Sequence, residues 1–561
     1  MAQPEVLACL ACDFPSHDFH DSPLYADAVF LVLDCLARSP QPQYVAPLFR
    51  KCLPLLLVQR REASAEDERE AELRDACGAI LAGFVRLASA SLEECSPTTT
   101  DALRLDLFAC LLTCRVLCGG AAVSVPASAS LAPSAHEQML AMRRSSSKRV
   151  AAGQGEPAEK QKIMLTLLSS HLRDCFSSAA AGLSCLQWSQ ENEKSSVVAA
   201  QIDGLLDREI EDAGRGSHEV LAARSIALAR LFAAHMRDPA SRGSKSSFAS
   251  RNSDNLCCWV FGHAAVRLLR STPADLNSAA LSSLLPLLLH LLSTYTADEK
   301  SLAAVLAHAV VTRSSSMVLV SCQALLMPPL MLALEVCDEP GSSFLLSRAA
   351  HAYLAAITVV NTGAHNSQNG AAGGSGSAST DAQAFSHRLI TVHLDQCSRG
   401  PERLVSSLLA LLLALPNLHH VLVGVYSRSL ADVVSAALNC FSLPTQTAAV
   451  CLVNALLREG TGGHLRPFVL PLIIEMARIF VYYSATAAAA ADGSNAALHD
   501  FSAVDCEARS QLLLALRGAC RTMRQTCPKE WADGVAMVLR AAANPLSCDS
   551  SLVAHLRNFS G

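Results

Sequence analysis

The N-terminal segment carries the residues best suited to metal chemistry. Cys9 and Cys12 have the spacing of a zinc chelate, because two intervening residues let both thiolates turn onto one ion. His17 and His20 follow and would supply two nitrogen ligands, although their spacing is tighter than the usual three to five residues. In a chain with 22 cysteines this Cys spacing also arises by chance. Two interpretations therefore stay open: a zinc site, or a capping first helix followed by a polar loop.

A second segment, residues 143–149, places basic residues directly before serines. Arginines ahead of serines suit a basophilic kinase, and phosphorylation would add about −1.5 to −2 charges per site. The phosphorylation candidates are Ser145, Ser146 and Ser147. The same residues also fit a nuclear-localisation patch or a solvated linker, and composition alone does not separate the three.

The remaining motifs do not predict catalysis. The chain has no Gly-x-Ser-x-Gly elbow, and its Gly-rich run at 370–377 lacks the Lys-Ser/Thr of a phosphate loop. His136-Glu137 and His218-Glu219 are not followed by the second histidine of the helical zinc-protease motif. Three further histidines lie in leucine-rich stretches and are expected to be polar groups on helix faces: His290, His419 and His420. We expect a protein that is not an enzyme and needs no cofactor.

The composition predicts closely packed helices. Hydrophobic residues make up 51% of the 561 residues but aromatic residues only 5%, so Leu, Ala, Val and Cys must build the core. Strand-rich domains would use more Tyr, Phe, Ile and Thr. A net charge of −5 disfavours binding to nucleic acid or to an anionic membrane. The N-terminus lacks a secretory or transit pattern, so we expect the protein in the cytoplasm, with the nucleus as a second compartment.

Three uncharged runs reach the length of a membrane span, at 276–297, 314–334 and 404–426. Each has proline with histidine or an amide side chain near its middle, where polar groups in lipid cost most. Basic residues do not cluster beside the runs. The runs are therefore predicted to be buried helices, with no membrane partner.

Leucine-rich stretches with an internal proline recur along the chain. The longest is 284–292, and shorter copies occur at 53–57 and 470–474. Such a helix buries nearly all its faces and needs helices on both sides. We predict an all-α, right-handed α-solenoid of about ten stacked helix pairs. Helical repeats are expected at 1–118, 160–237, 256–360, 383–484 and 501–561, with disordered insertions at 119–159 and 238–255, a Gly/Ser loop at 361–382 and an Ala-rich connector at 485–500.

The proline-bearing helices resemble the first helix of HEAT and armadillo repeats. In that family an Asp after the first helix and a basic residue in the second form a polar ladder, whereas here Ser293 and Thr294 occupy the ladder region. The resemblance implies a non-enzymatic scaffold or adaptor that binds partner proteins. An alternative is a nuclear transport receptor of the importin and exportin class, binding cargo and the Ran GTPase. Residues 465–471 look like a helix start of that group, and 526–559 is loosely similar to the tail of one branch. The chain is short for that class, and its pI near 6.4 is less acidic than is usual there.

Overall fold

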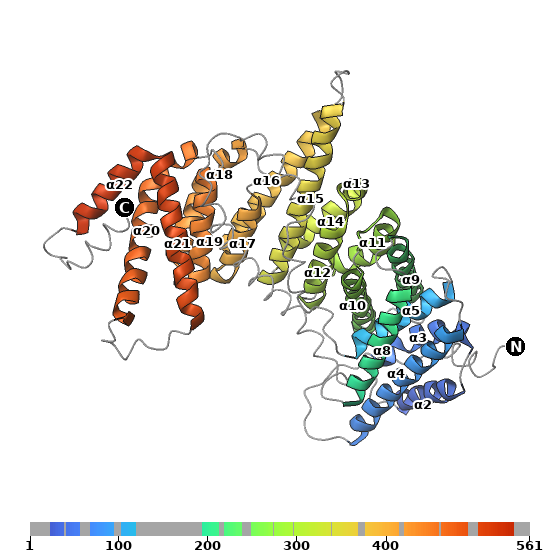
Figure 1. Cartoon of the computed structure of the whole chain (residues 1–561). Helices are drawn as coiled ribbons and strands as arrows, with labels where there is room; N and C mark the ends of the chain where they lie inside the picture. Colours follow the sequence, from blue (N-terminus) through green and yellow to red (C-terminus); the bar gives the residue numbers. More distant parts are fainter. Residues whose placement is uncertain are drawn as a thin grey trace. The chain divides into compact units, whose positions relative to one another are not determined.

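The computed structural model shows a chain of packed helices (Figure 1). Within the described residues there are nineteen helices and no strand, only one isolated bridge between Leu276 and Ser314. The chain divides into two compact units, Met1–Ala127 with Asp174–Ala349, and Ser128–Arg173 with Ala350–Gly561. The structure describes residues 23–38, 41–56, 68–94, 102–118, 193–212, 218–237, 248–272, 274–294, 297–337, 339–367, 376–414, 420–458, 462–491 and 503–542.

The first unit stacks its helices in two rows. Its helices are α2 (Pro23–Ala37), α3 (Pro42–Leu56), α4 (Glu68–Glu94), α5 (Ala102–Leu117), α8 (Glu193–Asp212), α9 (His218–Arg237), α10 (Phe248–Ser271), α11 (Ser278–Leu292), α12 (Ala297–Arg313), α13 (Ser316–Ser321), α14 (Gln323–Val336) and the first part of α15 (Pro340–Ser367). One row follows the contacts α3, α5, α9, α11 and α14, and the other contains α2, α4 and α8, then α10 and α12. From α2 to α12, each helix thus packs on a neighbour in its own row and on one in the other row.

The second unit repeats this arrangement with the rest of α15 and seven further helices. These are α16 (Gly376–Ser398), α17 (Pro401–Ala414), α18 (His420–Leu438), α19 (Leu443–Leu456), α20 (Gly462–Ala491), α21 (Ala503–Thr526) and α22 (Pro528–Ala542). One row runs through α16, α18, α20 and α22, and the other through α17, α19 and α21, which lie side by side in Figure 1. Contacts between alternate helices are the packing of an α-solenoid. The predicted all-α solenoid is confirmed.

Helix α11 shows how one proline-bearing repeat helix is built. The side chain of Asn277 caps its start by accepting a hydrogen bond from the Ala280 amide at 2.9 Å. Seven of its leucines are buried, but Pro286 lies on an exposed strip together with Ser282. The expectation that such a helix buries nearly all its faces is therefore wrong for α11, because the proline ring turns toward the surface.

The residues after α11 explain the missing polar ladder. The hydroxyl of Ser293 donates to the His290 carbonyl, and that of Thr294 to the Leu291 carbonyl, each at 2.7 Å. Both side chains thus satisfy the last carbonyl groups of their own helix. A ladder between neighbouring helices is instead formed elsewhere in the unit, by the ion pairs described below.

The three uncharged runs do not form membrane-length helices. The run at 276–297 contains the 15-residue α11, the run at 314–334 is split between α13 and α14, and the described part of the run at 404–426 belongs to α17 and α18. Two other described helices are long and apolar enough to cross a membrane, Asp75–Glu93 and Gly341–Val360. Half of the first and 89% of the second is buried, as in core helices.

Helices extend into three of the predicted insertions. Helix α10 begins at Phe248, inside the predicted insertion at 238–255, and α20 continues to Ala491 because alanine favours helix. The predicted loop at 361–382 is too long, since α15 ends at Ser367 and α16 begins at Gly376. The predicted insertion at 119–159 lies outside the described residues. The handedness of the stack and the number of repeats stay predictions.

Candidate functional site

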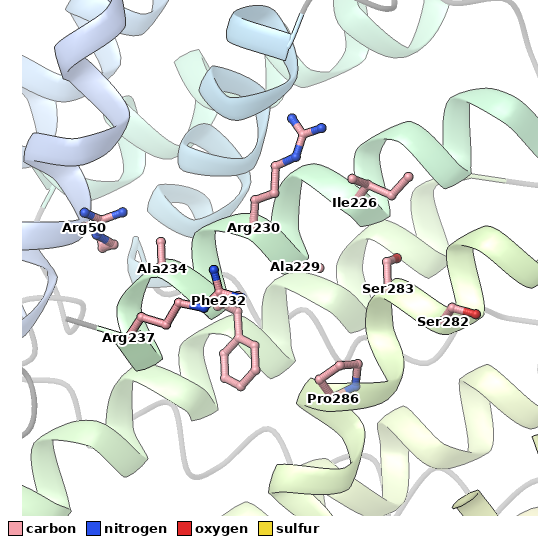
Figure 2. A pocket seen from close by; sticks show the side chains of 11 residues that line it. Arg50, Ile226, Ala229, Arg230, Phe232, Ala234, Arg237, Ser282, Ser283 and Pro286 are labelled. Carbon is pink, nitrogen blue, oxygen red and sulfur yellow. The ribbon is translucent and has the colours of Figure 1, made fainter.

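An open groove of about 770 Å³ runs along α9 in the first unit. Figure 2 shows its lining side chains. The α9 residues that line it recur at helical spacing and so form one stripe of the helix surface. They are Ile226, Ala229, Arg230, Phe232, Ala233, Ala234 and Arg237. The stripe combines small apolar side chains with two exposed arginines.

Helices on either side of α9 complete the groove, which we call the arginine groove. Arg50 reaches it from α3, and Ser282, Ser283 and Pro286 approach from α11 on the opposite side (Figure 2). The exposed strip of α11 is thus one wall of the groove. Phe232 is buried beneath it, with its ring 6.0 Å from that of Phe261 in an edge-to-face contact. The bottom of the groove is therefore stabilised by contacts between Phe232 and the core.

The charge of the arginine groove is positive. Three arginines line it and none of the lining residues is acidic. Asp106 lies 4.0 Å from Arg230 in a largely exposed ion pair, which is too weak to neutralise that arginine firmly. Burial raises the pKa of Asp106, and Arg230 opposes that rise. The local field is thus opposite in sign to the net charge of the chain.

One of the arginines has unused hydrogen-bonding capacity. The Nε of Arg50 is buried and donates to no atom of the described residues. A buried donor without a partner costs free energy of about 1–3 kcal/mol. A hydrogen-bond acceptor that reached this atom would remove that cost.

A buried ion-pair network connects α9 to α5 and α8, the helices packed behind the groove. Arg104 on α5 makes two hydrogen bonds to the carboxylate of Glu209 on α8, at 2.7 and 2.9 Å. Arg224 on α9 donates to the Glu209 carbonyl and stacks 4.5 Å from the ring centre of Phe108. Burial lowers the pKa of Arg224 to about 10, although Glu209 opposes this. The network links α5, α8 and α9.

A second ion-pair group extends the network to α10. Asp203 on α8 accepts from Arg115 on α5 at 2.8 Å and from Arg267 on α10 at 2.5 Å. Burial lowers the pKa of Arg267, and Arg115 adds to the decrease. One carboxylate therefore bridges two helices of the stack, and these contacts act as the polar ladder that the sequence lacks after α11.

A second groove, of about 920 Å³, lies between α4 and α8. Small residues such as Ala79, Gly83 and Gly204 line much of it. Arg86 and Arg208 are accompanied by Glu93, so its charge is mixed. It lacks the one-sided charge of the arginine groove.

Helix α14 carries an exposed apolar face. Leu325 and Leu332 expose 56% and 57% of their surface, and Val336 exposes 42%. Pro328 is also exposed and lies between them, giving a stripe with spacings of three and four residues. The opposite face is buried, with Leu326, Leu330 and Leu334 fully inside. Helix α14 is thus apolar all round but buried on one side only.

Most of the site residues predicted from sequence lie outside the described residues. They are Cys9, Cys12, His17, His20, Ser145, Ser146, Ser147 and His419. His290 is half-buried in α11, its ring 6.1 Å from that of Phe232, and burial lowers its pKa. His420 is the first residue of α18. Among the described residues, no group of three or more His, Cys, Asp or Glu side chains is placed to hold a metal ion.

The arginine groove was not predicted from the sequence, although the spacing of its α9 residues could have been recognised there. Arg230 and Arg237 are seven residues apart, which places them on one helix face above the Ile226 and alanine stripe. Arg50 carried no such signal, because it comes from a helix 180 residues earlier than Arg230 (230 − 50). Only the packing of α3 beside α9 brings it to the groove.

Comparison with known proteins gives distant structural neighbours only. No family model and no curated protein matches the sequence. Crystal structures of Kap121p bound to Pho4p and to the extreme C-terminus of the protein phosphatase Cdc14p are similar over 99% of this chain, with 11% and 10% identity and a TM-score of 0.26 in both cases. A structure of Kap121p bound to RanGTP is similar over 96%, with 11% identity and a TM-score of 0.25. The chain spans about half the length of these neighbours, 50% to 53%.

Proposed function

We propose that the chain is a non-enzymatic scaffold or adaptor that holds partner proteins on the surface of its stacked helices. A helical stack presents a continuous ridged surface, because each added helix extends the faces of its neighbours. The protein acts in the cytoplasm, with the nucleus as a second compartment. Fluorescence imaging of the tagged chain in cells checks this location.

The arginine groove is the observation that carries the proposal. It joins three helices into one open surface, lined by arginines from α3 and α9, by the isoleucine and alanine stripe of α9, and by Pro286 in the α11 wall. Protein interfaces likewise combine apolar and polar side chains, and arginine is among the residues enriched there. The ion-pair network behind the groove supports the same interpretation, since it ties α9 to the helices packed behind it.

The exposed face of α14 supports a second contact surface. Contiguous exposed leucine and valine side chains are uncommon on monomeric proteins and mark interaction sites when they are grouped. Leu325, Leu332 and Val336 are grouped on one stripe of one helix. A partner that reached both surfaces would bind more tightly than one that reached either alone.

Site-specific photo-crosslinking in cells tests the proposal. A photoreactive amino acid replaces Ser282, an exposed residue in the groove wall, and in a matched control it replaces Ala436, an exposed residue of α18. A defined partner band from position 282 that is absent at position 436 supports the scaffold. If neither position yields a partner band, or both give the same bands, the groove is not the contact surface.

The alternative, a nuclear transport receptor, is supported by the resemblance noted at 465–471. That segment lies in the first three turns of α20, which begins at Gly462. The 526–531 segment forms the junction of α21 and α22, while the end of the resembling tail lies outside the described residues. A pull-down with Ran loaded with GTP or GDP decides between the two. Binding that depends on GTP favours the receptor, and equal or absent binding favours the scaffold.

A further inference from the structure

We propose that the arginine groove binds an acidic, amphipathic segment of the partner protein, with carboxylates on the arginines and an apolar side chain on the apolar lining. The inference rests on the proposed function and adds the chemistry of the bound segment to it. Its basis is the charge of the lining, its apolar side chains and the spacing of the arginines along α9.

The first step is charge complementarity. Arg50, Arg230 and Arg237 line the groove without an acidic residue among the lining side chains. Guanidinium groups bind carboxylates through paired, charge-assisted hydrogen bonds. A basic segment would be repelled, and a neutral segment would leave the charges of the three arginines uncompensated. The lining therefore selects an acidic segment.

The second step is the apolar lining. The half-buried side chains of Ile226 and Ala233 and the exposed ring of Pro286 line the same groove as the arginines. An acidic segment without apolar residues would leave this surface in contact with water. A segment that carries both acidic and apolar side chains covers both kinds of lining.

The third step is spacing. Arg230 and Arg237 are seven residues apart on one helix, which separates their backbone positions by about 10 Å at a rise of about 1.5 Å per residue. A peptide extended in the polyproline II conformation advances about 3.1 Å per residue and has three residues per turn, so its side chains three residues apart lie on the same side. Carboxylates three residues apart in an extended segment therefore match the two arginines, and a further acidic residue would face Arg50.

Peptide phage display against the full-length chain tests the inference and does not require the partner to be identified. Short random peptides are selected on the wild-type chain, with the R230Q/R237Q variant used for counter-selection. Both arginines are exposed, so this variant is expected to fold, and circular dichroism and urea unfolding verify that it does. We expect enrichment of peptides with acidic residues three apart and an apolar residue between them.

The enriched peptide is then measured by fluorescence polarisation. We expect its affinity to fall at least about tenfold when its acidic residues become Gln, and by a similar factor in R230Q/R237Q. Its affinity should also weaken as salt is raised, because exposed charges are screened. The matched control is R86Q/R208Q in the groove between α4 and α8, which should bind the peptide as the wild-type chain does.

Enrichment of no peptide, of peptides without acidic residues, or of peptides that bind R230Q/R237Q at full affinity would overturn the inference. These outcomes are distinct from failure of the scaffold proposal. A partner that crosslinks from position 282 and is insensitive to R230Q/R237Q leaves the scaffold intact and removes only the acidic-segment chemistry. Absence of any crosslinked partner removes the scaffold function of this groove.

Discussion

Arg104 on α5 donates two hydrogen bonds to the carboxylate of Glu209 on α8, from Nε at 2.9 Å and from Nη2 at 2.7 Å. The two residues are 105 positions apart in the sequence. The two side chains expose only 9% and 13% of their surface, so water screens the pair little. Planar two-point contact between a guanidinium and a carboxylate is specific in orientation as well as in charge. The pair therefore fixes how α8 lies on α5.

Replacing Glu209 by Ala should destabilise the first unit strongly. The change leaves the buried guanidinium of Arg104 without its anion, and breaking a buried pair in this way costs about 3–5 kcal/mol. Urea unfolding followed by circular dichroism measures the loss as a lower transition midpoint. The control is Asp34→Ala, which removes the exposed pair with Arg38 and should change stability by less than about 1 kcal/mol. Equal midpoints for the two variants would contradict the assigned role.

Two helical glycines should respond to alanine in opposite directions. A Cβ at Gly262 in α10 would lie 2.6 Å from Leu302 Cδ2 and 2.8 Å from Leu291 Cδ1, both in the core. We expect Gly262→Ala to destabilise by about 1–3 kcal/mol through overpacking. At Gly78 in α4 no atom lies within 4 Å of an added Cβ, so Gly78→Ala should stabilise by about 0.5–1 kcal/mol. Thermal unfolding of both variants provides the comparison, and a shift of the same sign in both would refute it.

The second unit should lose stability in mild acid. The Nε2 atoms of His351 and His393 lie 3.3 Å apart, and both residues are buried. Burial lowers the pKa of His351 well below its usual value, with His393 adding to the decrease, and burial lowers that of His393 to about 4. Both are neutral in the folded protein, whereas in the unfolded chain a histidine takes up a proton near pH 6.5. The unfolded state then binds more protons.

The sign and size of this effect follow from proton linkage. The stabilisation from the neutral pair is complete above about pH 6.5 and is lost as the pH falls toward about 4, by up to about 1.4 kcal/mol per pH unit for each histidine. Urea midpoints measured between about pH 7.5 and 5 should fall. The H351Q/H393Q variant, which cannot titrate at these positions, should show a shallower fall. The variant keeps other buried histidines whose pKa is lowered by burial, such as His263 and His308 in the first unit, so some pH dependence should remain. If the wild-type chain and the variant show the same pH dependence, the His351–His393 pair does not contribute to it.

The two faces of α14 should tolerate substitution very differently. Leu330 is fully buried, and Leu330→Ala should cost about 2–5 kcal/mol. Leu332 on the opposite face is more than half exposed, and Leu332→Ser should change stability by less than about 1 kcal/mol while reducing partner capture. Urea unfolding and quantitative recovery of crosslinked partner measure the two effects. Full partner recovery by a Leu325→Ser, Leu332→Ser double variant would exclude this face from the binding surface.

Helix positions can be predicted well where the signal is local. Periodicity predicts a helix over 22–38, and α2 covers Pro23–Ala37. A helix is likewise expected from 528 to 543, and α22 covers Pro528–Ala542. Helical periodicity and proline position act within a few turns, so neighbouring residues suffice to define them. Insertions are predicted less well, because serine, glycine and alanine near a helix end are also compatible with continued helix, as at the start of α16.

Catalytic and metal motifs are recognised at close sequence spacing, whereas the candidate site is assembled from α3, α9 and α11. Its α9 stripe could be found from helical spacing alone. Arg50, the α11 wall and the ion pairs behind them could not. Each depends on which helices pack together, and that is decided by the fit of many apolar side chains at once.

The sequence by itself determined that this chain is helical, repetitive and free of a recognisable catalytic motif, because composition and periodicity are local properties. Tertiary structure alone decided that Pro286 faces the surface, that Glu209 is bound by Arg104, and that Arg50 meets Arg230 and Arg237 in one groove. These three relationships depend on which helices pack against each other in the stack. A helix stripe becomes core or binding surface only when its neighbours in the stack cover it or leave it open.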